Sequence, residues 1–191
     1  MERTAVGAYL RTTQAWSLQL CEKETLDFGI AYVNPRYAAL PEACEFREVV
    51  IEPAQSQTAF DQVERWFTER RLRCLRWAPA EMQPVAPLEA LLVPRGFVPK
   101  RFAVLALTQW KELDVTADLR ILPARAMRSA FRSTFSDRVQ ADAHGERLDD
   151  PQLDMFVAVG PDGPVGRCGL YQVGDIARVI EPVATPTGDP A

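Results

Sequence analysis

Three short apolar runs separated by tight-turn signals dominate the C-terminal third of the chain. They cover residues 155–159, 165–173 and 176–181, with Pro161-Asp162-Gly163-Pro164 and Gly174-Asp175 between them. Apolar and β-branched runs joined by Gly, Pro and Asp are typical of antiparallel strands with tight turns. The pattern therefore predicts a meander of three antiparallel strands, with ten residues following Glu181.

The N-terminal part alternates between helical and strand-like patterns. Apolar residues at helical spacing predict a helix over residues 3–22, a second helix capped by Thr58 and a third starting at Pro87. Strands are predicted at residues 27–33, 46–51, 74–78 and 102–107, the last being a near-continuous apolar run typical of a buried strand. This alternation predicts an α/β (α+β) fold, with helices flanking a mixed, largely antiparallel sheet.

A polar, charged stretch at residues 109–118 predicts a linker, placed at 111–118, between domains at 1–110 and 119–191. The second domain is expected to begin with a strand at 120–122. Its next element is one helix, because Met127, Phe131, Phe135 and Val139 repeat every four residues. A polar loop or broken helix is expected at 141–150. The tetrapeptide Val-Ile-Glu-Pro at 50–53 and again at 179–182 favours an internal duplication.

The end of the predicted meander, Glu181-Pro182-Val183-Ala184-Thr185-Pro186, resembles the E-P-V-A-T-x-P run of the GNAT superfamily of N-acetyltransferases. The first half resembles the degenerate first domain of tandem GNAT proteins. The resemblance implies a degenerate GNAT-like domain at 1–110 and the N-terminal half of a second one at 119–191. The glycine-rich turn that follows this run in the family is missing, since residues 187–191 contain one glycine and no arginine. We therefore expect the second domain to be truncated before the acyl-CoA pyrophosphate loop.

The resemblance also implies a function, which is acyl transfer from acetyl-CoA to the amine of a small molecule or protein. It puts Glu181 at the position of the general base and Val183, Ala184 and Thr185 where the strand end contacts the pantetheine arm. Without the glycine-rich turn, weak cofactor binding and little or no turnover are expected. The alternative is a non-catalytic interaction module that keeps the fold, with a homodimer forming through the open sheet edge.

Composition limits the kinds of partner and site that the chain is expected to have. A net charge of −4 argues against a nucleic-acid-binding surface, and no apolar run approaches the length of a membrane span. The four cysteines are scattered without a C-x-x-C pair, so we expect no metal site and reduced thiols in the cytoplasm. The single histidine, His144, is expected to be solvated in its loop.

Overall fold

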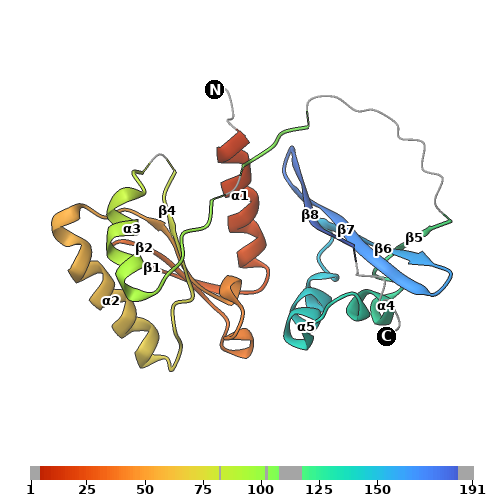
Figure 1. The fold of residues 1–191 in the computed structure, drawn as a ribbon, viewed down its shortest axis with the longest axis horizontal. Helices are drawn as coiled ribbons and strands as arrows, with labels where there is room; N and C mark the ends of the chain where they lie inside the picture. The colour runs from red at the N-terminus through yellow and green to blue at the C-terminus, as the bar shows by residue number, and fades with distance from the viewer. Residues whose placement is uncertain (1–4, 82, 102, 108–117, 185–191) are drawn as a thin grey trace. The chain divides into compact units, whose positions relative to one another are not determined.

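The computed structural model describes residues 5–81, 83–101, 103–107 and 118–184. The chain divides into two compact units, Met1–Val104 and Leu105–Ala191, and each contains one four-stranded sheet (Figure 1). The mixed α and β fold with flanking helices is therefore confirmed. Residues 111–117 of the predicted linker lie outside the described residues, and the GNAT-like identity of each unit stays a prediction.

The first unit is a three-stranded meander followed by a parallel crossover. The strands β1 (Glu22–Leu26), β2 (Gly29–Val33) and β3 (Cys44–Val49) pair antiparallel in sequence order. The chain then passes through α2 (Ser56–Glu69) to β4 (Arg76–Pro79), which lies parallel to β3. The remaining helices are α1 (Ala5–Leu18), α3 (Ala86–Leu92) and four 3-10 turns at Pro35–Tyr37, Pro41–Ala43, Pro53–Gln55 and Val93–Arg95.

The two faces of this sheet differ in chemistry. Phe46 of β3 belongs to an apolar core with Val63, Phe67 and Leu91 of α2 and α3. The opposite face carries α1 (Figure 1), whose buried residues are Thr12, Thr13 and Ser17. Hydrophobic burial therefore holds α2 and α3 on the sheet, whereas polar contacts hold α1.

Several predicted boundaries in this unit are wrong. The first helix ends at Leu18 instead of residue 22. The strand β1, which no pattern predicted, follows because the polar segment EKETL gains its strand conformation from pairing with β2. The second helix begins at Ser56, so Thr58 is not its cap. The buried strand expected at 102–107 is absent from the described residues 103–107, where Leu105 and Leu107 are 90% and 78% exposed. An apolar run forms a strand only where a neighbouring strand pairs with it, and no such partner is described.

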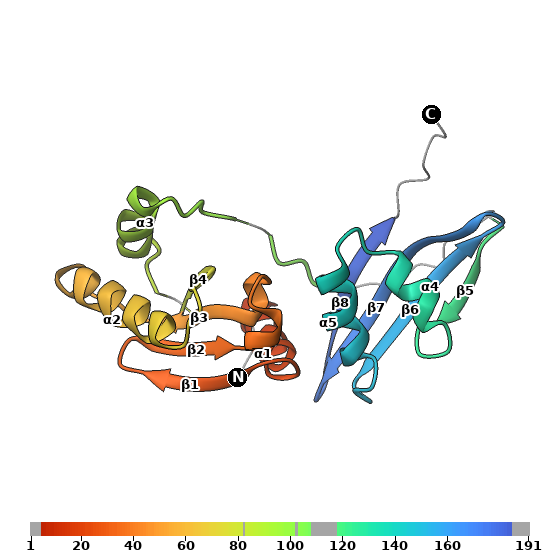
Figure 2. The ribbon, with the colours of Figure 1, turned by 90° about the horizontal axis from the view of Figure 1, so that it is seen from below.

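The second unit contains the predicted meander. The sheet has the order β5 (Arg120–Pro123), β6 (Leu153–Gly160), β7 (Gly163–Val173) and β8 (Ile176–Ala184), all antiparallel. One face carries α4 (Arg128–Ser133) and α5 (Arg138–Arg147), as Figure 2 shows. Gly163 and Gly174 have φ angles of 128° and 60°, as required of the turn residues that join β6 to β7 and β7 to β8.

The single helix predicted through Met127 and Val139 is two helices. The helix is interrupted between Ser133 and Arg138. Asp137 caps the second helix, α5, by accepting a 2.8 Å hydrogen bond from the Gln140 backbone N–H. Of the polar loop or broken helix expected at 141–150, most residues are therefore helical. His144 is on this helix and only 6% exposed, so the expectation of a solvated histidine is wrong. The four-residue apolar repeat revealed the buried face of α4 but not the cap that starts α5.

Candidate functional site

Each unit has a glutamate at a β-bulge in the third strand of its meander. In β3, Arg47 and Glu48 lie opposite one residue of β4, and in β8, Glu181 and Pro182 lie opposite one residue of β7. Glu48 and Glu181 have left-handed backbones, with φ of 54° and 50°. Such conformations are uncommon outside glycine and cluster at bulges that redirect a side chain.

The bulges move both carboxylates to the other face of their sheets. Strand alternation would place Glu48 on the same face as Phe46, yet its carboxylate accepts a 3.0 Å hydrogen bond from Gln14 of α1, on the opposite face. Alternation would likewise place Glu181 beside the exposed Val179, yet its carboxylate lies against Arg167, a buried residue. The Val-Ile-Glu-Pro repeat is not in structural register, because Glu52 follows the end of β3 whereas Glu181 lies inside β8.

Glu181, the base implied by the resemblance, is at the centre of a polar cluster. Its Oε2 accepts hydrogen bonds of 2.9 and 3.3 Å from Nη2 and Nε of Arg167. The other oxygen, Oε1, lies 4.0 Å from Nε2 of His144. The Glu181 side chain is 29% exposed, so it is partly accessible to solvent.

Arg167 connects this carboxylate to the helices. Its Nη1 donates to the backbone oxygen of Thr134 at 2.6 Å and to Oγ1 of the same residue at 3.2 Å. The guanidinium carbon lies 3.6 Å from the centroid of the Phe135 ring, and the His144 ring stacks on that ring at 5.1 Å. Sequence reasoning identified Glu181 but missed Arg167 and His144, which reach it only through the fold.

The other predicted cofactor contacts lie at the edge of the second sheet. Val183 pairs with Arg167 and Ala184 with Gly166, so each uses one side of its backbone for β7. The outer side of β8 has no neighbouring strand among the described residues. Thr185 lies outside the described residues.

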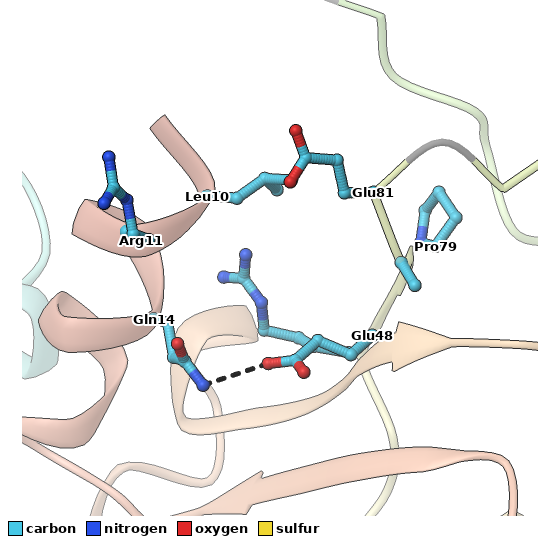
Figure 3. A pocket seen from close by; sticks show the side chains of 8 residues that line it. Leu10, Arg11, Gln14, Glu48, Pro79 and Glu81 are labelled. Atoms are coloured by element: carbon cyan, nitrogen blue, oxygen red, sulfur yellow. Dashed lines mark hydrogen bonds between the residues drawn. The ribbon is translucent and has the colours of Figure 1, made fainter. Parts of the chain in front are cut away.

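The first unit has a cavity of about 200 Å³ where β3 and β4 end next to each other (Figure 3). Helix α1 contributes Leu10, Arg11 and Gln14, the bulge contributes Arg47 and Glu48, and the end of β4 contributes Pro79, Ala80 and Glu81. Adjacent carboxyl ends of parallel strands are a common location for ligand crevices. No local pattern predicted this cavity, because its residues come from three separate segments.

A buried ionic cluster lies beside this cavity. Glu45, which is fully buried, accepts hydrogen bonds from the Ser17 hydroxyl at 2.6 Å and from Nε of Arg76 at 2.7 Å. Arg47 places its Nη1 3.5 Å from the same carboxylate. The buried Tyr32 hydroxyl is close to this group. Burial raises its pKa above the ordinary value, an effect that Gln14 and Arg47 partly offset.

A second cavity of about 320 Å³ lies at the N-terminus of α2, lined by Ser56, Gln57, Leu91 and Arg95 among others. Arg95 already donates to the Gln57 side chain and to the Leu91 carbonyl, both at 2.5 Å. The segment 54–58 contains no glycine. A cation at a helix N-terminus suits an anionic group, although this loop lacks the glycines that let phosphate approach a backbone closely.

Neither a metal-binding cluster nor a membrane-spanning helix is present in the described part of the chain. No group of three or more His, Cys, Asp or Glu side chains there is arranged to hold a metal ion. Every helix in those residues is too short or too polar to span a bilayer.

Comparison with known proteins identifies no family. No family model matches the chain, and no curated protein matches it. Among solved structures, it is similar to a functionally unknown conserved protein from Staphylococcus epidermidis ATCC 12228. The two chains are 10% identical with a TM-score of 0.48, and the match covers 86% of this chain and 71% of the other. A likeness at this level carries no functional argument.

Proposed function

We propose that the protein transfers an acetyl group from acetyl-CoA to an amine, with a bulge glutamate as the general base. The observation that supports this proposal is the pair of bulges that turn Glu48 and Glu181 toward the α1-bearing and α4–α5-bearing faces of their sheets. Bulges of this kind are frequent next to active sites. The sequence resemblance around Glu181 supports the same chemistry.

The glutamate would accept the proton lost by the amine nitrogen as that nitrogen attacks the thioester carbonyl. The C–N bond of the amide forms, the C–S bond breaks, and the acetyl group leaves its thiol carrier. Glu48 has an open cavity in front of it, whereas one oxygen of Glu181 is occupied by Arg167. The first unit is therefore the better placed of the two for catalysis.

The residues present fit acetyl-CoA in part. Each unit offers a separate and partial candidate position. In the second unit, the open outer edge of β8 at Val183 and Ala184 could pair with the amide groups of an extended pantetheine arm. Ser56 and Arg95 at the start of α2 supply donors and charge for phosphate groups in the first unit. The missing glycines predict weak binding at that position.

The test is a kinetic comparison of three glutamine variants, with the acetylated amine quantified by mass spectrometry. Removing a general base lowers kcat by about 100-fold or more. We expect this loss for Glu48→Gln and a smaller one for Glu181→Gln. Glu52→Gln is the matched control, because this exposed glutamate belongs to the first Val-Ile-Glu-Pro copy and lies outside both clusters. Unchanged rates in both bulge variants, or no acetyl transfer to any amine, would refute the proposal.

A second candidate function, an interaction module, is favoured by the uncovered face of the second sheet. Pairing registers place Ile121, Phe156, Leu170 and Val179 on this face, and all four are exposed. Contiguous exposed apolar side chains mark protein-binding surfaces. Light scattering tests this idea, since a defined dimer that Leu170→Lys returns to monomer supports it and a monomer at all concentrations contradicts it.

A further inference from the structure

We propose that the cavity between α1, β3 and β4 binds a small aliphatic α-amino acid, with its ammonium at Glu48 and its carboxylate at Arg47 and Arg11. The inference rests on the proposed function, because it names the amine that would receive the acetyl group. It is carried by the charges, burial and size of the cavity.

The cavity lining contains two acidic and two basic side chains. The carboxylates are those of Glu48 and Glu81, and the guanidinium groups are those of Arg11 and Arg47. Figure 3 shows Glu48 and Glu81 on the strand side of the cavity and Arg11 on α1. A ligand that carries one charge of each sign meets an oppositely charged side chain for each of its two groups.

The buried cluster leaves positive charge available to the cavity. Glu45 is one carboxylate shared by two guanidinium groups, those of Arg47 and Arg76. Arg76 makes the closer contact with it, and Arg47 is 3.5 Å away. Arg47 is buried yet only loosely paired, so a ligand carboxylate at the cavity would complete its coordination.

Gln14 orients the Glu48 carboxylate. Its amide nitrogen donates to Oε1 of Glu48, which holds the carboxylate toward the cavity. Because Gln14 is neutral, its hydrogen bond orients the Glu48 carboxylate without itself contributing a charge. The carboxylate that binds the amine is then the same one that is proposed to remove its proton.

Size and the apolar lining limit the rest of the ligand. A volume of about 200 Å³ corresponds to roughly six or seven waters, well below the space that drug-sized ligands occupy. Leu10, Pro79 and Ala80 supply apolar contact. These features suit a short aliphatic side chain and disfavour a polyamine or a peptide.

The first experiment measures binding of three matched probes to the full chain by heteronuclear NMR, without acetyl-CoA. The probes are L-leucine, 3-methylbutylamine, which lacks the carboxylate, and 4-methylpentanoate, which lacks the amine. We expect saturable shifts at Gln14 and Glu48 with leucine and about ten-fold weaker binding of each analogue. Equal binding of leucine and the amine, or no saturation up to about 20 mM leucine, would overturn the inference.

Two variants and a control locate the site. Glu48→Gln is expected to weaken leucine binding about ten-fold and Arg11→Gln about three-fold, since Arg11 is exposed and its contact is screened by solvent. Arg73→Gln is the control, because this exposed arginine does not line the cavity. An unchanged leucine affinity in both Glu48→Gln and Arg11→Gln would place the ligand elsewhere and overturn the inference.

The failure of this inference can be distinguished from that of the proposed function. Leucine binding without acetyl transfer would refute the function and leave the amino-acid site intact. Acetyl transfer to 3-methylbutylamine with the same kcat/KM as to leucine would support the function and overturn the amino-acid selectivity.

Discussion

The carboxylate of Glu48 accepts a 3.0 Å hydrogen bond from the side-chain amide of Gln14, which connects the bulge of β3 to the helix on the polar face of the sheet. Arg167 plays the corresponding part for Glu181 in the second unit, with a charged donor in place of a neutral one. Both bulge glutamates are therefore oriented by a specific partner. The energetic cost of losing such a partner differs between the two units.

Replacing Arg167 by methionine should destabilise the second unit by about 2–3 kcal/mol. The substitution removes the donor to the buried Thr134 carbonyl and leaves the Glu181 carboxylate unpaired. Chemical denaturation followed by NMR of residues in β6 and β7 measures the loss. Arg120→Met, at an exposed position of β5, is the control and should change stability by less than about 0.5 kcal/mol. Equal stability of the two variants would contradict the role assigned to Arg167.

Neutralising the buried Glu45 should cost the first unit about 3 kcal/mol. Glu45→Gln leaves the buried guanidinium of Arg47 without a carboxylate, while Glu22→Gln, on the exposed strand β1, serves as the control. The double variant Glu45→Gln, Arg47→Met removes both charges and should recover part of the loss. If the loss in the double variant equals the sum of the losses in Glu45→Gln and Arg47→Met, the two groups are not a coupled pair.

The buried thiols should make stability fall at alkaline pH. Burial raises the pKa of Cys74 far above its ordinary value of 9.0, and burial also raises that of Cys44. Below pH 9 both thiols are neutral in the folded and unfolded chain. Above it the unfolded thiols ionise first, so the free energy of unfolding falls as the pH rises. The slope is about 1.4 kcal/mol per pH unit for Cys74, and Cys44 contributes in the same direction.

Denaturation between pH 8 and about 10.5 measures this slope, which Cys74→Ala should reduce by the contribution of one proton. In the folded protein at pH 8, a thiol reagent should modify Cys168 rapidly and the other three slowly, because Cys168 is the exposed one. Equal rates at all four cysteines would show that the buried positions open readily.

A methyl group at Gly169 should be poorly tolerated. A Cβ there would lie 2.8 Å from the Asp154 backbone oxygen and 2.2 Å from Sδ of Met155. The methionine can move but the backbone of β6 cannot, so we expect Gly169→Ala to cost about 3 kcal/mol. Gly160→Ala is the control, since its nearest neighbour would be Cγ1 of Val165 at 3.3 Å. Thermal unfolding of the two variants gives the comparison, and similar midpoints would contradict the close approach of β6 and β7.

The sequence was most informative where local chemistry sets the conformation. Gly174-Asp175 and the apolar runs beside it predicted the turn and strands of the second sheet, because a tight turn fixes the pairing of its flanks. The strand EKETL was missed because its conformation comes from pairing with β2. Residues 103–107 were predicted to be buried on hydrophobicity alone, and no pairing partner for them is described.

In the candidate sites too, contacts between segments far apart in the sequence could not be predicted. Glu181 was noticed because of the residues that follow it, whereas its partners Arg167 and His144 come from another strand and a helix. Neither bulge could be predicted, since a left-handed glutamate has no local sequence signature. The alternation of β3 alone would have placed Glu48 on the face opposite to the one it occupies.

The polar face that holds α1 has a consequence for how a small molecule could enter. Because Thr12, Thr13 and Ser17 replace apolar contacts, partial opening of α1 should require less free energy than opening of α2. Amide protons of α1 should then exchange with solvent before those of the apolar core. An occupant held between Arg11 and Glu48 would contact this helix, so its binding should slow the exchange of the α1 amide protons.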